Sequence, residues 1–213
     1  MGFINQFNLN RIVREYDIRY FFETGTWKGD AVAHALQFPF EMIISAEIIP
    51  AIAEEAKSRF QQEPRVTIIE ASSTEALSAT LPALNGNCLF WLDAHFPGAD
   101  AGMERYDAIQ DEDIRLPLEK ELSIIHELRK NYQDLLIIDD LRVYEEGPYE
   151  NGNAPADTLP QKNRNLDFIN RLFDKSHITM KTYKNEGYLL LFPKAANRLT
   201  KSFLDDLFLS SKK

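Results

Sequence analysis

Short apolar runs alternate with helical patterns along most of this 213-residue chain, and this alternation constrains the fold more than any other feature. Alternation of strand and helix over such lengths is typical of a parallel sheet with crossover helices. The predicted strands cover residues 20–24, 42–48, 66–70, 88–93, 134–139, 177–183 and 187–192. The predicted helices cover residues 3–16, 30–37, 50–60, 74–81, 116–131, 165–174 and 197–209.

The end of the chain departs from the parallel pattern. Only residues 184–186 separate the last two predicted strands, which is too short for a crossover connection. These strands are therefore expected to form an antiparallel hairpin.

The composition predicts an ordinary globular chain, with 44% hydrophobic and 27% charged residues. We expect a single domain over residues 1–213, with an N-terminal helical extension at 1–17 and two long loops at 96–114 and 142–164. The net charge of −9 argues against nucleic-acid and anionic-membrane partners, which need a basic surface. The single Cys88, the lack of a signal-peptide pattern and the lack of a long apolar run predict a cytoplasmic protein.

A strand, a glycine turn and a helix follow one another in residues 20–29. The apolar run ends in Glu23, and Gly25 and Gly29 precede the helical pattern. Such a turn brings backbone N–H groups close to a nucleotide-like ligand. The spacing matches neither the G-x-G-x-x-G fingerprint nor the P-loop. Glu47, at the end of the next strand, could accept both hydroxyls of a ribose, or could simply be a charge at the start of the following helix.

Carboxylates also follow the fourth and fifth predicted strands. Asp93 closes one, and Asp139 and Asp140 close the other. Three carboxylates at one sheet edge would repel each other without a cation among them, and oxygen ligands suit Mg²⁺. Alternatively, Asp139 and Asp140 could cap a helix, and Asp93 could bond the glycine turn. His95 has a side chain whose ordinary pKa, near 6.5, suits a general base at neutral pH, although a plain polar contact is the alternative.

The E-x-G-x-x-x-G pattern of Glu23, Gly25 and Gly29 resembles the motif of class I S-adenosylmethionine methyltransferases. Together with the strand-end aspartates, it resembles the metal-dependent O-methyltransferases of the catechol and macrocin types, over about residues 18–193. The resemblance implies a Rossmann-like α/β sandwich. Its seven-stranded, mostly parallel sheet would carry helices on both faces and a C-terminal antiparallel strand.

The resemblance also implies roles for individual residues. The implied catalytic base is His95, two residues after the metal-binding Asp, as in the macrocin type. The catechol type has a lysine three residues after that Asp, where this chain has Phe96. Ser72 stands where many members have an adenine-binding Asp, and a capping-box spacing with Glu75 competes for its hydroxyl. The implied cofactor-binding residues are Glu23, Gly25, Thr26, Trp27, Gly29, Glu47, Ser72 and Asp93, and the implied metal ligands are Asp93, Asp139 and Asp140.

The resulting functional prediction is an S-adenosylmethionine-dependent O-methyltransferase, assisted by Mg²⁺ or another hard divalent cation, acting on a hydroxyl of a small molecule or sugar. The metal would lower the pKa of that hydroxyl. The helix at 3–16 could act as a lid or form a homodimer contact. Two alternatives stay open: a non-catalytic methyltransferase-like partner module, and a Mg²⁺-dependent nucleotide-sugar or phosphate enzyme, for which Lys28 and Arg142 are the nearby basic residues.

Overall fold

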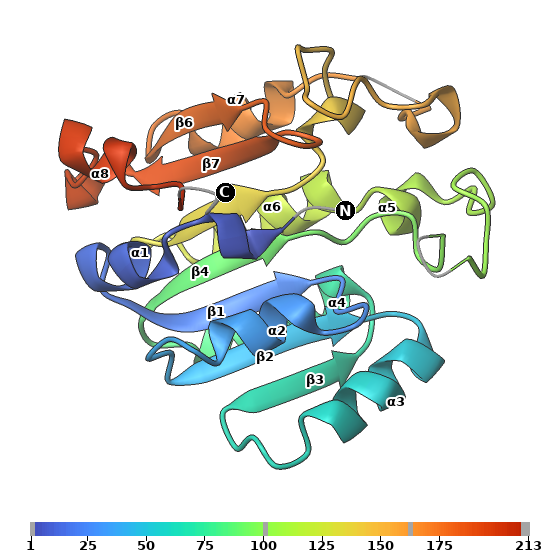
Figure 1. Cartoon of the computed structure of the whole chain (residues 1–213), viewed down its shortest axis with the longest axis horizontal. Helices are drawn as coiled ribbons and strands as arrows, with labels where there is room; N and C mark the ends of the chain where they lie inside the picture. The colour runs from blue at the N-terminus through green and yellow to red at the C-terminus, as the bar shows by residue number, and fades with distance from the viewer. Residues whose placement is uncertain (1–2, 100–101, 162–163, 210–213) are drawn as a thin grey trace.

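A seven-stranded sheet forms the centre of the computed structural model, which describes residues 3–99, 102–161 and 164–209. The strand order is β3-β2-β1-β4-β5-β7-β6 (Figure 1). Neighbours from β3 to β5 are parallel, whereas β7 is antiparallel to both β5 and β6. The strands are β1 (Ile18–Thr24), β2 (Met42–Glu47), β3 (Val66–Glu70), β4 (Asn87–Leu92), β5 (Leu135–Ile138), β6 (His177–Thr182) and β7 (Tyr188–Pro193).

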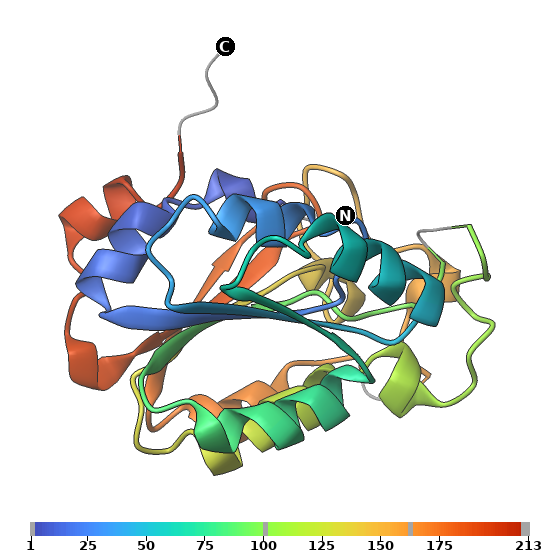
Figure 2. The same ribbon diagram turned by 90° about the horizontal axis from the view of Figure 1, so that it is seen from below.

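Helices cover both faces of the sheet, with α1, α2, α3 and α8 on one side and α4, α6 and α7 on the other (Figure 2). The predicted α/β sandwich with a C-terminal antiparallel strand is therefore confirmed. The α-helices are α1 (Leu9–Glu15), α2 (Asp30–Ala35), α3 (Pro50–Arg59), α4 (Ser73–Thr80), α5 (Glu112–Arg115), α6 (Leu118–Leu128), α7 (Asp167–Phe173) and α8 (Lys201–Asp205). Short 3₁₀ turns are η1 (Ile4–Gln6), η2 (Leu81–Ala83), η3 (Leu141–Val143), η4 (Ala156–Thr158) and η5 (Lys194–Ala196).

Each face of the sheet contributes to its own apolar core. Successive residues of a strand point to opposite faces, so Phe22 packs in the layer with α4 and α6, and Phe21 packs in the layer with α1 and α2. Both phenylalanines are fully buried. Burial on both faces explains why the central strands have continuous apolar runs instead of an alternating pattern.

The predicted helix at 3–16 is wrong as a single element, because it is interrupted at Phe7. Phe7 forms a β-bridge with Phe208, and the ring of Phe7 packs edge-on against Tyr188. The Asn8 side chain then accepts the Arg11 N–H and starts α1. The two chain ends thus satisfy each other's backbone groups.

The same pairing shortens the predicted helix at 197–209 to α8. The Asn8 N–H donates to the Leu207 carbonyl at 2.8 Å, and the Leu209 N–H donates to the Gln6 carbonyl at 2.7 Å. A helix continuing to 209 would use these groups internally, so the extended pairing with the N-terminal segment replaces it.

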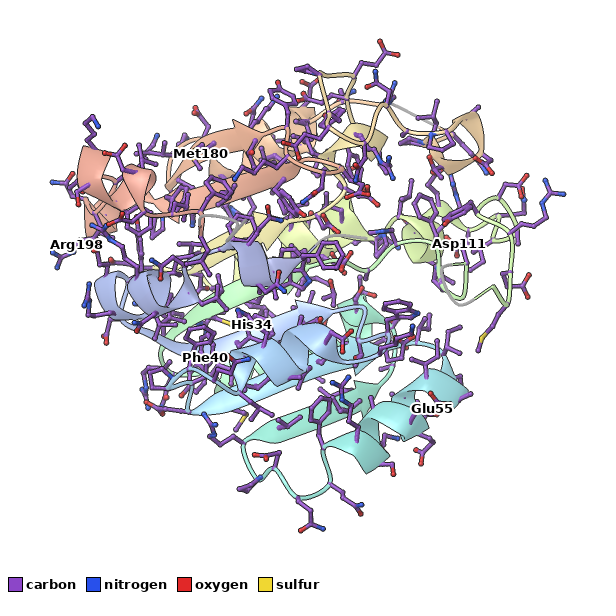
Figure 3. The ribbon with its side chains drawn as sticks, viewed as in Figure 1. His34, Phe40, Glu55, Asp111, Met180 and Arg198 are labelled. Carbon is purple, nitrogen blue, oxygen red and sulfur yellow. The ribbon has the colours of Figure 1, made fainter. Side chains whose placement is uncertain are left out.

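The long loops lie at the carboxyl ends of the parallel strands. Asp111, at the start of α5, is on this side of the molecule, and Arg198 is at the opposite end (Figure 3). Residues 100–101 and 162–163 of these loops, residues 1–2 and the terminal pair Lys212 and Lys213 lie outside the described residues. Within the described part of the chain, no helix combines the length and the apolar character needed to cross a membrane.

Candidate active site

A cavity of about 590 Å³ opens at the carboxyl edge of the sheet, a volume within the usual range for small-ligand sites. The ends of β1, β2 and β4 form its walls, together with the starts of α2 and α4. The predicted site residues that line it are Glu23, Gly25, Thr26, Trp27, Glu47, Ser72, Asp93 and His95. Three predicted site residues, Gly29, Asp139 and Asp140, are not part of this lining.

The two glycines of the turn have different structural roles. Both have left-handed backbones, with φ of +85° at Gly25 and +74° at Gly29. A Cβ atom on Gly25 would lie 2.8 Å from the Asp93 carbonyl oxygen, so only glycine lets the turn approach the end of β4. A Cβ atom on Gly29 would lie 2.6 Å from the Phe60 ring. Gly25 therefore shapes the cavity, and Gly29 leaves room for the Phe60 ring just after α3.

Glu47 is held in place by two backbone amides. Its Oε2 accepts the Trp27 N–H at 3.0 Å, and its Oε1 accepts the Ile49 N–H at 2.9 Å. The second bond corresponds to the alternative interpretation, a charge at the start of α3. Each carboxylate oxygen can accept more than one hydrogen bond, so Glu47 keeps acceptor capacity for a ligand in the cavity.

A chain of short hydrogen bonds connects Glu23 to the glycine turn. The Ser45 hydroxyl donates to Glu23 Oε2 at 2.6 Å and lies 2.6 Å from Thr26 Oγ1. Burial raises the pKa of Glu23 to about 8, although the Ser45 bond opposes this rise. Sequence reasoning missed Ser45, whose signal was a lone hydroxyl within the apolar run of β2.

Ser72 is engaged as the N-cap of α4. Its Oγ accepts the Glu75 N–H, and its own N–H donates to the Glu75 carboxylate at 3.1 Å. This capping box confirms the predicted helix start. Ser72 still lines the cavity, so its predicted contact with an adenine stays a prediction.

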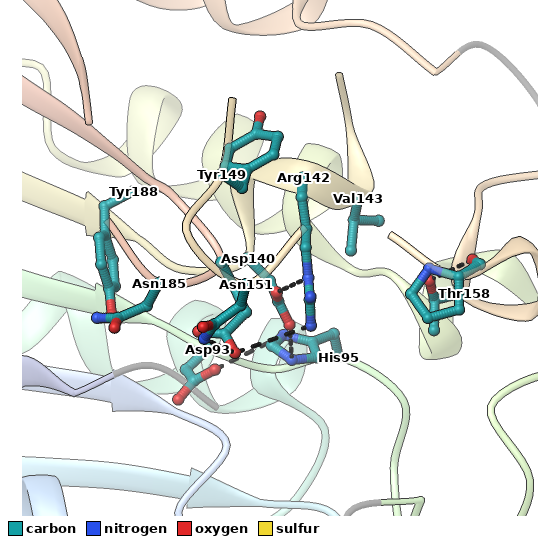
Figure 4. A network of polar contacts seen from close by, with 12 residues as sticks. Asp93, His95, Asp140, Arg142, Val143, Tyr149, Asn151, Thr158, Asn185 and Tyr188 are labelled. Carbon is teal, nitrogen blue, oxygen red and sulfur yellow. Dashed lines mark hydrogen bonds and ion pairs between the residues drawn. The ribbon is translucent and has the colours of Figure 1, made fainter. Parts of the chain in front are cut away.

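His95 lies between two of the predicted carboxylates (Figure 4). Its Nε2 is 3.0 Å from Asp140 Oδ2, and its Nδ1 is 3.6 Å from Asp93 Oδ1. Arg142 Nε donates to the other oxygen of Asp140 at 3.1 Å. Asp140 itself has a left-handed backbone, with φ of +53°. The imidazole therefore has an oriented contact on each of its nitrogens.

The carboxylates of this cluster reduce their mutual repulsion in two ways: Asp93 shares a hydrogen bond with Asp139, and Asp140 contacts the basic side chains of His95 and Arg142. Asp93 and Asp139 are hydrogen-bonded to each other, and burial followed by the charge of the other acids raises the pKa of Asp93 well above its usual range. Burial and Asp140 raise the pKa of Asp139 to about 6. Burial alone would raise the pKa of Asp140 too, but the contacts with His95 and Arg142 lower it overall.

The aspartates supply the oxygen donors that a hard divalent cation prefers, but they do not converge around one point. Asp140 uses its two oxygens for His95 and Arg142, while Asp93 bonds Asp139. In residues 3–99, 102–161 and 164–209, no group of three or more His, Cys, Asp or Glu side chains is placed to hold a metal ion. The arrangement does not fit the predicted three-aspartate site.

A buried acid that sequence reasoning missed lies behind this cluster. Glu121 of α6 is 1% exposed and hydrogen-bonds the side chains of Ser73 and Thr24. Burial raises the pKa of Glu121 to about 7, while those two bonds and the charge of His95 oppose the rise. A small cavity of about 10 Å³ is lined by Glu121, His95, Asp139, Asp140 and Tyr144, among others.

The chain is similar in structure to several solved methyltransferases. A "putative caffeoyl-CoA O-methyltransferase" from Staphylococcus aureus is 14% identical, with a TM-score of 0.58 over 91% of this chain and 84% of that chain. The SAH-bound methyltransferase PaMTH1 from Podospora anserina is 15% identical, with a TM-score of 0.56 over 91% and 80%. An O-methyltransferase from Bacillus cereus, in complex with SAH, is 14% identical, with a TM-score of 0.52 over 91% and 82%.

No protein-family model matches the sequence, and the search of curated proteins found no significant match. At these low identities the structural likeness establishes the fold. The chain has the Rossmann-like α/β methyltransferase fold, and its cavity lies at the carboxyl edge of the sheet, where open α/β sheets bind ligands.

Proposed function

We propose that this chain is an S-adenosylmethionine-dependent methyltransferase that acts on a hydroxyl oxygen of a small molecule or sugar. The observation that carries the proposal is one continuous cavity, which is lined by Glu47 and the glycine turn together with Asp93 and His95. Two of the structurally similar proteins contain SAH, S-adenosylhomocysteine, the product that remains after methyl transfer.

The cavity offers a donor or acceptor for each part of the cofactor. Glu47 would accept the ribose hydroxyls with the lone pairs that Trp27 and Ile49 leave open. Gly25 has no side chain, so the turn lies close to the end of β4 with no side-chain atoms of residue 25 in the cavity. When bound, S-adenosylmethionine supplies a methyl group on a positively charged sulfur. Beside that charge, the carboxyl groups of Glu23 and Asp93 would lose their protons more readily.

His95 is the proposed base. With its Nε2–H donated to Asp140, His95 would accept the proton of the acceptor hydroxyl at Nδ1, the nitrogen that faces Asp93. The acceptor's O–H bond breaks, its oxygen forms the new bond to the methyl carbon, and the bond between that carbon and sulfur breaks. Asp140 at 3.0 Å would then stabilise the positive imidazolium.

The aspartates as arranged do not fit a shared cation. Metal assistance therefore gains no support from their geometry and stays a prediction. No step of the proposed reaction passes through a metal ion. The small-molecule or sugar acceptor, the lack of nucleic-acid and membrane partners, the homodimer and the cytoplasmic location likewise stay predictions.

Calorimetric titration with S-adenosylhomocysteine tests the cofactor site. We expect Glu47→Ala to weaken binding by at least tenfold, about 1.4 kcal/mol, because two ribose hydroxyls lose their acceptor. Glu63→Ala, which removes an exposed acid away from the cavity, is the matched control. If the wild type does not bind S-adenosylhomocysteine, the methyltransferase proposal is wrong.

Methyl transfer to a panel of catechols, polyols and sugars tests the base. His95→Asn should lower kcat by roughly 10²- to 10⁴-fold, the usual contribution of a general base, without changing the affinity for S-adenosylhomocysteine.

Repeating the assay with Mg²⁺, with chelator and with Asp139→Ala tests the metal prediction. Tight cofactor binding without turnover on any acceptor would favour the non-catalytic partner module instead.

A further inference from the structure

Glu121 occupies a position that the fold by itself would give to an apolar residue. The buried face of α6 consists of Leu118, Glu121, Leu122 and Ile125, at the spacing of a helix face that packs on a core. Their neighbours are apolar core residues of the sheet and of α4. The acid at 121 is the exception on this face.

The contacts of Glu121 lead directly to the turn that carries Asp93 and His95. Its carboxyl group hydrogen-bonds the Thr24 hydroxyl at the end of β1. Oγ1 of Thr24 accepts the Asp93 N–H at 3.3 Å and the Ala94 N–H at 3.4 Å. A hydroxyl has a single proton, so a Thr24 hydroxyl that donates to Glu121 keeps its lone pairs for the two amides.

A second contact connects Glu121 to the cofactor side of the cavity. Its carboxyl group also hydrogen-bonds Ser73, the first residue of α4, and the adjacent Ser72 lines the cavity. One side chain of α6 therefore contacts the end of β1 and the start of α4, and through Thr24 it reaches the end of β4.

We propose that Glu121 is a positioning residue, which fixes the Thr24 hydroxyl and thereby the turn at 93–95 that presents His95 to the acceptor. This inference rests on the proposed methyltransferase function. It assigns Glu121 a role beside the cofactor and base residues, although Glu121 does not line the main cavity.

The energetics support a functional reason for the acid. Within the described chain, Glu121 Oε1 is buried and has no hydrogen-bond partner, and burying a polar atom in this way costs stability. Replacing Glu121 by leucine would remove that cost. A fold selected for stability alone would therefore favour an apolar residue at this position.

The test uses Glu121→Leu, Thr24→Val and the double variant, with Glu127→Leu on the exposed face of α6 as the matched control. Three quantities are measured: kcat for methyl transfer, the free energy of unfolding, and amide hydrogen exchange at Ala94. Asp93 serves as the internal reference for exchange, because its N–H also donates to the Thr24 backbone carbonyl at 3.1 Å.

We expect Glu121→Leu to lower kcat by roughly 10- to 100-fold, since a small misplacement of a reacting group costs about that much. Exchange at Ala94 should become faster, and the control should change neither quantity. The double variant should stay within about twofold of the slower single variant in kcat, because the two residues act in one chain.

Unchanged exchange at Ala94 in Glu121→Leu overturns the inference, whatever the activity. Faster exchange with full kcat overturns it too, since the turn would then move without consequence. If the wild type methylates no acceptor but exchange at Ala94 still depends on Glu121, the proposed function is wrong and the positioning of the turn stands.

Discussion

At the scale of single residues, folding changes the protonation of Glu23. The side chain is 2% exposed, and its closest polar partner is the neutral hydroxyl of Ser45. Among the described residues, no cationic side chain forms a hydrogen bond or ion pair with Glu23. The fold therefore favours the uncharged acid, and its pKa rises to about 8 from 4.5.

This shift predicts a pH-dependent stability. The folded state binds the Glu23 proton more tightly than the unfolded chain, so the contribution to the free energy of unfolding is full below about pH 4.5 and is lost as pH rises through about 8. Relative to Glu23→Gln, the cofactor-free wild type should lose up to about 5 kcal/mol between these pH values. Denaturant unfolding across this range measures the difference, with Glu63→Gln as control. Parallel curves for wild type and Glu23→Gln would contradict the prediction.

At the scale of elements, local signals placed most helices and strands correctly because they report local chemistry. Pro50 is the first residue of α3, and Pro117 lies one residue before α6 begins, both positions that suit a proline. The errors fall at Phe7 and Phe208, where backbone pairing over two hundred residues replaced helical bonds. No local pattern contains information about a partner that distant.

The capping box of α4 gives the prediction at this scale. Ser72→Ala should lower the free energy of unfolding by about 1 kcal/mol, because the bonds of the Ser72 hydroxyl with the Glu75 N–H and carboxylate are lost. Ser78→Ala, which removes a hydroxyl bonded to the Thr74 carbonyl within the same helix, is the control. Calorimetry with S-adenosylhomocysteine then separates the two interpretations of Ser72: unchanged affinity favours the cap alone, and weaker binding supports the adenine contact.

At the scale of the whole molecule, the two edges of the sheet have different tasks. The carboxyl edge contains the cavity, whereas the opposite edge contains a buried ion pair. Arg129 Nε lies 2.9 Å from Asp134 Oδ2, and Asp134 Oδ1 accepts the Cys88 N–H at 2.7 Å. Both charged residues are almost fully buried. This pair joins the end of α6 to the starts of β4 and β5.

Removing one partner of this pair should affect stability without affecting binding. Arg129→Met should lower the free energy of unfolding by about 3–5 kcal/mol, because Asp134 would stay buried without its countercharge. The exposed neighbour Lys130→Met is the matched control. Thermal unfolding and S-adenosylhomocysteine titration are the measurements, and a loss of affinity in a folded Arg129→Met protein would contradict the separation of the two edges.

The sequence by itself determined the order of strands and helices and the polar residues that end each strand. Parallel strands bring their carboxyl ends to one edge, and Glu23, Glu47 and Asp93, which lie at the ends of three such strands, line one cavity. Both the strand pattern and the glycine turn depend on residues close together in the chain.

Only the tertiary structure decided which way the side chains beyond the strands point. Asp140 follows β5, as predicted, but its left-handed backbone directs it to His95 and Arg142, and it does not line the main cavity. Glu121 reaches Thr24 because α6 packs beneath the end of β1. Loop backbone angles and the packing of distant elements set these directions, and neither is encoded in a short run of residues.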